Sequence, residues 1–192
     1  MNETRSETER VYAVPSMALL ESFTLPPDSW SPTQEPSSVI EAGEQYKFKT
    51  ALVIGRFQPL HWGHIYLIHK ALEMSKSVVI GIGSSNTADE KNPFPALQRH
   101  LLLERTLNRE GIRSRINNIV HLTDHDDDNQ WLQRTVYRTG EVEAVVGNNQ
   151  WVNGIFENAG FQTVEIPMYK RQIYKGEEIR RNLRSAGLLR PH

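Results

Sequence analysis

The chain has 192 residues, of which 38% are hydrophobic and 23% charged, a size and composition that suit one main folded domain. No stretch approaches the roughly 20 unbroken apolar residues that cross a bilayer, which excludes a membrane-spanning protein. Cysteine is absent, which excludes disulfides, cysteine-bound zinc, iron–sulfur clusters and a thiol nucleophile. The amino-terminal residues match neither a secretory nor a transit peptide, so we expect a cytoplasmic protein without a membrane partner.

Charge and proline divide the chain into two unlike parts. Residues 1–46 hold five of the ten prolines and eight acidic against two basic residues. So little apolar surface cannot offset the entropy of ordering a chain, and we expect a disordered acidic tail in which only residues 17–20 dock transiently. Residues 47–192 carry 20 basic and 15 acidic residues. A mildly cationic domain suits a ligand that bears phosphate.

From residue 47 onward, strand patterns alternate with helical patterns. The strands are expected at 51–54, 77–82, 118–122, 144–146 and 163–167. The helices are expected at 63–74, 95–108, 131–139, 151–158 and 177–185. This alternation predicts an α/β fold, a Rossmann-like parallel sheet with helices on both faces.

The segment between the first expected strand and the first expected helix carries the most chemistry. Residues 54–64 run Ile-Gly-Arg-Phe-Gln-Pro-Leu-His-Trp-Gly-His. A glycine turn that leads into a helix start offers free backbone N–H groups and a positive dipole end to phosphate. His61 and His64 lie on one helix face and can donate to the same phosphate oxygens, and Arg56 adds a planar fork of donors. Taken alone, the histidines also fit a structural pair or half of a metal site.

This turn and several later motifs resemble the archaeal-type nicotinamide mononucleotide adenylyltransferases of the HxGH nucleotidylyltransferase superfamily. The motifs follow one another in the family's order across about residues 48–187. The later ones are Gly81-Ile82-Gly83-Ser84-Ser85, Lys91-Asn92-Pro93-Phe94, Asp124 with Trp131, Gly147-Asn148, and Lys175-Gly176-Glu177-Glu178-Ile179-Arg180-Arg181.

The resemblance implies transfer of AMP from ATP to nicotinamide mononucleotide (NMN), giving NAD and pyrophosphate. The attacking phosphate is already anionic, so catalysis needs orientation and charge stabilisation and no general base. The catalytic residues implied are His61, His64, Arg56, Lys91 and Arg180. The ATP contacts implied are Gly55, Arg56, Phe57, His61, His64, Gly147, Asn148, Lys175, Gly176, Ile179 and Arg180. The NMN contacts implied are Gly83, Ser84, Ser85, Lys91, Phe94, Asp124 and Trp131.

Cofactor and partners follow from the same resemblance. Mg²⁺ is expected to arrive with ATP, held by phosphate and water, with no metal site built from protein side chains. The family also implies a homo-oligomer. The basic residues near the end of the chain lack the aromatic residues and motifs of a nucleic-acid surface, so no nucleic-acid partner is expected.

Two positions depart from the family pattern. Lys175 and Glu177 stand where relatives have hydroxyl residues at the start of the last helix. A carboxylate facing ATP repels the phosphates unless it turns outward or Lys175 compensates. We expect Glu177 to face ATP and to weaken binding. A transferase with another phosphorylated acceptor, and a nucleotide-binding regulator with little turnover, therefore remain alternatives.

Two further features allow a structural interpretation beside the functional one. Trp131 suits either a stacking surface for nicotinamide or a place in the core. The acidic and histidine-rich residues 121–128 suit a metal site less well than a solvated loop that caps the following helix.

Overall fold

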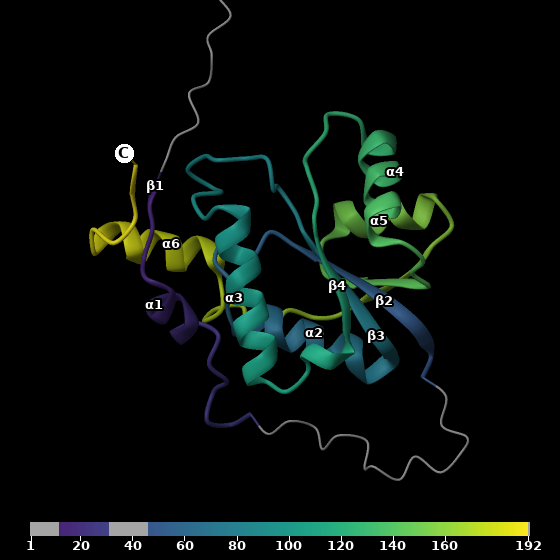
Figure 1. Cartoon of the computed structure of the whole chain (residues 1–192), viewed down its shortest axis with the longest axis horizontal. Helices are drawn as coiled ribbons and strands as arrows, with labels where there is room; N and C mark the ends of the chain where they lie inside the picture. Colours follow the sequence, from purple (N-terminus) through teal and green to yellow (C-terminus); the bar gives the residue numbers. More distant parts are fainter. Residues whose placement is uncertain (1–11, 31–45, 192) are drawn as a thin grey trace, which may run out of the picture.

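A computed structural model describes residues 12–30 and 46–191, and its centre is a parallel sheet of five strands. The strands lie in the order β4-β3-β2-β5-β6, so the order reverses between β2 and β5 (Figure 1). Their bounds are β2 Phe48–Gly55, β3 Ser75–Ile82, β4 Ile116–His121, β5 Ala144–Gly147 and β6 Gln162–Glu165. In open sheets of this kind, ligands bind at the carboxyl ends of the strands, next to that reversal.

Helices cover both faces of the sheet, as the alternating pattern predicts. They are α2 Trp62–Met74, α3 Ala96–Arg109, α4 Asp128–Thr139, α5 Gln150–Asn158 and α6 Gly176–Ser185. Alternate residues of β2 enter different apolar clusters: Ala51 and Val53 pack with α2, α3 and α6, while Leu52 packs with α4 and α5. The Rossmann-like fold class is therefore confirmed.

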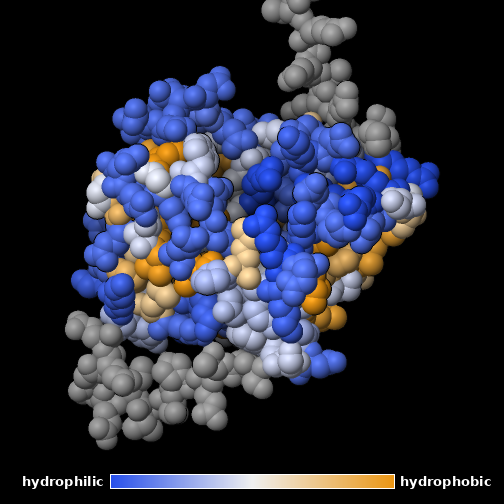
Figure 2. All heavy atoms as spheres, turned by 180° about the vertical axis from the view of Figure 1, so that it is seen from behind, coloured by the Kyte–Doolittle hydropathy of each residue, from blue (hydrophilic) through white to orange (hydrophobic). Residues whose placement is uncertain are grey.

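The ten expected strands and helices of the domain are all present, with small shifts at their ends. The largest shift at a strand start is in β2, which begins at Phe48 because Phe48 and Thr50 pair with Ser75 and Ser77 of β3. Figure 2 shows that one face of the molecule is mainly hydrophilic, with the hydrophobic side chains in separate patches. Within the described residues, the helices are too short or too polar to cross a membrane.

The prediction of a disordered tail is wrong for residues 12–30. They form β1 (Tyr12–Ala13) and α1 (Met17–Ser22), and β1 pairs with β7 (Arg190–Pro191) beside the carboxyl terminus (Figure 1). Leu20 is 1% exposed and belongs to the main apolar cluster. The composition of 1–46, taken as an average, hides the few apolar residues that pack. Residues 1–11 and 31–45 lie outside the described part of the chain.

Candidate active site

A cavity of about 360 Å³ opens at the carboxyl ends of β2 and β5, where the strand order reverses. Five segments line it: the turn after β2, the first turns of α2, the residues after β5, segment 168–175, and the start of α6. The side chains that bear positive charge or hydrogen-bonding nitrogen there are Arg56, Gln58, His61, His64, Asn148, Asn149, Arg171, Lys175 and Arg180. The sequence predicts six of these nine residues as site residues and misses Gln58, Asn149 and Arg171.

The turn after β2 is held in an unusual backbone conformation. Phe57 has a φ of 51°, a left-handed value that costs free energy outside glycine and is concentrated at functional sites. A Cβ on Gly55 would lie 2.9 Å from the Phe57 ring, so the ring closes over the strand end. The Gln58 side chain both donates to the Phe94 carbonyl oxygen and accepts from the Phe94 N–H, at 3.1 and 3.0 Å. The turn is therefore fixed before any ligand binds.

The two histidines form a stacked pair at the start of α2, with 3.8 Å between ring centroids. The His61 backbone N–H donates to Nδ1 of His64 at 3.3 Å, which leaves the His64 proton on Nε2. Burial lowers the pKa of His61 to about 4, and burial together with the nearby His61 lowers the pKa of His64 well below its usual value. Both rings are thus neutral N–H donors at pH 7. Nδ1 of His61 is buried and has no hydrogen-bond partner in the described structure.

The start of α6 lies directly against this turn. A Cβ on Gly176 would lie 2.9 Å from the Gln58 carbonyl oxygen, so only glycine allows this approach. Arg180 is 8% exposed and donates from Nη1 to that same oxygen. Burial, with Arg56 and Arg184 nearby, lowers the pKa of Arg180, although a guanidinium stays charged at pH 7. Two arginines therefore place positive charge in the cavity beside the neutral histidines.

Glu177 lies at the cavity, and Lys175, the residue that could compensate its charge, lies beside it. Its carboxylate lies 3.6 Å from Nζ of Lys175, and the two side chains are 75% and 46% exposed. Glu177 lines the cavity, where it is the single carboxylate among the lining residues that the structure describes. Lys175 therefore offsets the negative charge, and water screens both groups.

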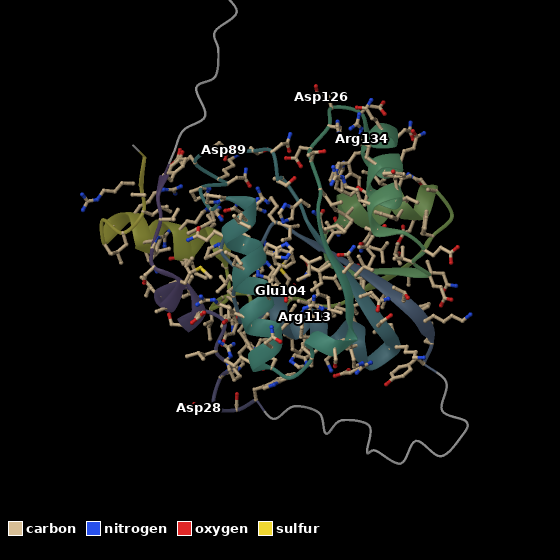
Figure 3. The ribbon with its side chains drawn as sticks, in the orientation of Figure 1. Asp28, Asp89, Glu104, Arg113, Asp126 and Arg134 are labelled. Carbon is tan, nitrogen blue, oxygen red and sulfur yellow. The ribbon has the colours of Figure 1, made fainter. Side chains whose placement is uncertain are left out.

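Three of the residues implied for ATP or catalysis lie outside this cavity lining. Ile179 is 9% exposed and packs in the core, and Gly147 ends β5 just before the lining residue Asn148. Lys91 is exposed, in the loop after β3. Asp89 organises that loop, since Oδ1 accepts the backbone N–H groups of Lys91 and Asn92 at 2.7 Å (Figure 3). The structure does not bring Lys91 to the histidine pair.

The residues implied for NMN gather on the β3 and β4 side of β2. Gly83 donates its N–H to the Gly55 carbonyl oxygen at 2.9 Å, so it lies beside the turn. Ser85 donates to the Leu122 carbonyl at 2.9 Å, which ties the loops after β3 and β4 together. Asp124 accepts from the Thr87 hydroxyl at 3.1 Å in the same place. Ser84 and Phe94 are buried behind these loops, at 7% and 1% exposure.

Trp131 lies in the core and not on a binding surface. It is 3% exposed, with its ring centroid 5.0 Å from Trp151 and 6.1 Å from Phe156. The geometry does not support the nicotinamide-stacking role and favours the core role. Asp127 in the preceding acidic loop caps α4 by accepting the Gln130 N–H at 2.7 Å. In the described residues, no group of three or more His, Asp or Glu side chains is arranged to hold a metal ion.

Comparisons with known proteins agree with this geometry. The cytidylyltransferase-like family model matches residues 52–182. The nicotinamide-nucleotide adenylyltransferase of Methanosarcina mazei is 38% identical over 134 residues, 69% of this chain and 76% of the relative. The enzyme of the same name from Thermoplasma acidophilum is 33% identical over 141 residues, 73% of this chain and 78% of the relative. The chain belongs to the nicotinamide-nucleotide adenylyltransferases.

Solved structures extend the likeness to three dimensions. A bifunctional NMN adenylyltransferase/ADP ribose pyrophosphatase from Francisella tularensis superposes with a TM-score of 0.64 at 30% identity, over 72% of this chain and 43% of that chain. Its complex with AMP and a manganese ion gives a TM-score of 0.60 at 28% identity, over 72% and 42% of the two chains. The shared part is the nucleotidyltransferase fold.

In this family member, Arg99 is a functional residue that the sequence analysis misses. It is 2% exposed on α3 and donates to four carbonyl oxygens, those of Phe94, Arg56, Gly83 and Ser84. It therefore braces the turn after β2 against the loop after β3, at the border between the two groups of implied ligand contacts. A signal is present in the sequence, because Arg99 shares a helical face with the apolar Leu102, Leu103 and Leu107.

Proposed function

We propose that the protein transfers AMP from ATP to NMN and releases pyrophosphate, forming NAD. The observation that carries this proposal is the stacked pair of neutral histidines in a cationic cavity at the strand-order reversal. A phosphate oxygen of NMN attacks the α-phosphorus of ATP, and the bond from that phosphorus to the bridging oxygen breaks. The bonding electrons leave with pyrophosphate, so no proton has to be removed from the nucleophile.

The residues of the cavity supply what this reaction needs. Negative charge moves from the attacking phosphate to pyrophosphate, and donors aimed at the phosphates stabilise it. His64 offers Nε2–H, because its Nδ1 already accepts the His61 N–H. Arg56 and Arg180 add positive charge to the same cavity. Since the turn is already held by Gln58 and Arg99, little reorganisation is required when ATP binds.

We propose that the divalent ion enters as part of the substrate, Mg-ATP. The donor set of the cavity consists mainly of imidazole, guanidinium, amine and amide groups, with the exposed Glu177 as its carboxylate. Such groups recognise phosphate, whereas Mg²⁺ prefers oxygen ligands in octahedral geometry. The ion would bridge phosphate oxygens and keep waters as its other ligands.

The loops that carry Gly83, Ser85 and Asp124 are the proposed site of the acceptor. They lie beside the turn, on the opposite side from the cavity residues that follow β5. In-line transfer needs the attacking phosphate oxygen of NMN and the leaving pyrophosphate on opposite sides of the α-phosphorus, and binding NMN at these loops is compatible with that arrangement. Lys91 is proposed as an additional phosphate contact from the loop after β3. We further propose a cytoplasmic location and a homo-oligomeric assembly.

One assay tests the reaction and its alternatives. The purified protein is incubated with Mg-ATP and, separately, NMN, phosphopantetheine or riboflavin phosphate, and pyrophosphate release is followed. We expect release with NMN, together with NAD in the product mixture. If pyrophosphate were released only with another acceptor, that acceptor and not NMN would be the substrate. Binding of Mg-ATP without release in any mixture would identify a nucleotide-binding regulator instead.

A further inference from the structure

Residues 12–30, here called the N-terminal arm, precede the matched family domain and reach its catalytic turn. The carbonyl oxygen of Phe23 accepts the N–H of Trp62 at 2.8 Å. Trp62 is the first residue of α2 and lies between the two histidines in the sequence. The first N–H groups of a helix have no partner within the helix, so the arm satisfies one of them. The family model begins only at residue 52.

The arm ends at Trp30, whose ring contacts both α2 and segment 168–175. On the α2 side, the Trp30 ring lies edge-on to Trp62 and Tyr66, with centroids 5.3 and 5.8 Å away. On the other side it meets Tyr169 edge-on at 6.4 Å. Tyr169 lines the cavity and stacks on Tyr66 at 4.6 Å. Trp30 therefore packs where α2 and segment 168–175 meet.

Further contacts continue from this point toward the histidines. Lys170 donates from Nζ to the Ser29 hydroxyl at 3.4 Å, a second link between the arm and segment 168–175. Tyr169 stacks on Tyr174 at 5.9 Å, and Tyr174 lies parallel to His61 at 6.3 Å. A row of aromatic rings thus runs from the arm to the catalytic pair.

The arm is itself firmly attached to the domain. Thr24 is fully buried, and its carbonyl and hydroxyl oxygens accept Nη2 of Arg109 at 2.7 and 3.1 Å. The Thr106 hydroxyl donates to the Thr24 hydroxyl at 3.3 Å. These bonds anchor the arm to α3, so a change at Trp30 removes the aromatic contact while the rest of the arm stays in place.

We propose that Trp30 is a positioning residue for the nucleotide site. It fixes the spacing between the start of α2, which carries the histidines, and segment 168–175, which lines the facing wall. It acts through Tyr169 and Trp62 and does not touch the substrate. The effect on turnover rests on the proposed function, whereas the effect on nucleotide binding does not.

The test compares binding of Mg-ATP by calorimetric titration. We expect Trp30→Ala to weaken binding about tenfold, in the range of coupling found along packed side chains. Trp30→Leu keeps an apolar group and secures the fold, and we expect it to weaken binding by a similar factor at a melting temperature close to that of the wild type. Glu21→Gln is the matched control, since it removes only the exposed ion pair with Arg105 on the same arm. Binding within twofold of wild type in a folded Trp30 variant would overturn the proposal.

A double-mutant cycle separates positioning from general destabilisation. Trp30 is proposed to link α2, through Trp62, to segment 168–175, through Tyr169. Loss of Tyr169 already breaks this link, so adding Trp30→Ala to Tyr169→Ala should change Mg-ATP binding less than twofold. Independent, additive losses would contradict the proposal. A wild-type protein that binds Mg-ATP but does not convert NMN would remove the proposed function and leave this cycle valid.

Discussion

Two walls of the cavity, the turn after β2 and the start of α6, differ in how far water reaches their polar groups. The turn after β2 is buried from Phe57 to His61 and braced by Gln58 and Arg99, and its histidines are neutral. The start of α6 has Arg180 buried against the turn, while its outer residues Lys175 and Glu177 form an exposed ion pair. The first wall provides fixed hydrogen-bond donors, and the second provides charge that water partly screens.

This difference suggests how the two walls tolerate substitution. A buried donor that is held by backbone bonds keeps its full electrostatic effect, because little water competes with it. An exposed pair contributes little, and its residues can change without changing the geometry of the site. At the start of α6, the two residues that differ from the pattern the sequence resembles, Lys175 and Glu177, belong to the exposed part.

The largest effect is expected from removing a donor of the buried wall. His64→Ala should lower turnover by about 10² to 10³, the usual loss for one preorganised donor to developing charge. Pyrophosphate release with saturating Mg-ATP and NMN measures it. Lys70→Ala, on the same helix but outside the cavity lining, is the control and should leave the rate unchanged. A His64→Ala enzyme with wild-type turnover would show that this histidine does not act in the reaction.

Arg99, which braces the turn after β2, should contribute to the free energy of unfolding. Arg99→Met leaves the carbonyl oxygens of Arg56 and Gly83 without a side-chain donor, and those of Phe94 and Ser84 with one donor fewer. We expect the free energy of unfolding to fall by about 3 kcal/mol. Urea unfolding measures the change. Arg105→Met, on the exposed side of the same helix, should change the free energy of unfolding by no more than about 0.5 kcal/mol. A similar fall in the free energy of unfolding in both variants would show that the hydrogen bonds of Arg99 do not stabilise the fold.

The neutral state of the buried histidines predicts a pH dependence of stability. Below pH 6.5 the unfolded chain protonates His61, whereas the folded protein resists until its pKa of about 4. The unfolded state therefore binds more protons, and the free energy of unfolding falls as the pH drops through this window. From pH 7 to pH 5 the contribution of His61 is about 2 kcal/mol. His61→Asn should be less pH-dependent than wild type by this amount in urea unfolding, and equal slopes would contradict the assignment.

The smallest effect is expected at the exposed wall. Glu177→Thr should tighten Mg-ATP binding only about two- to threefold, because the carboxylate is 75% exposed and already paired with Lys175. Glu178→Thr is the control, since Glu178 pairs with Arg181 and is absent from the cavity lining. Calorimetric titration distinguishes the two variants. A tenfold gain in Mg-ATP affinity for Glu177→Thr would mean that the carboxylate meets ATP directly. The start of α6 would then affect binding as strongly as a buried group does.

Much of the domain could be predicted from its sequence because the signals are local. Strand and helix periodicity, with the glycines and caps between them, specify each element within its own few residues. The turn at 54–64 joins a strand end to a helix start. His61, His64 and Arg56 are therefore close in space because they are close in the sequence. The structure brings all three to the cavity.

Only the tertiary structure decided the features that depend on distant partners. Arg99 acts on carbonyl groups up to 43 residues away in the sequence, and Trp131 is buried because α5 packs against α4. The arm looks disordered when its composition is averaged, yet Leu20, Thr24 and Trp30 meet a surface formed by α2 and α3. Local sequence determines which element forms, whereas burial and pairing depend on which surfaces the fold presents to each other, and those surfaces exist only after the chain has folded.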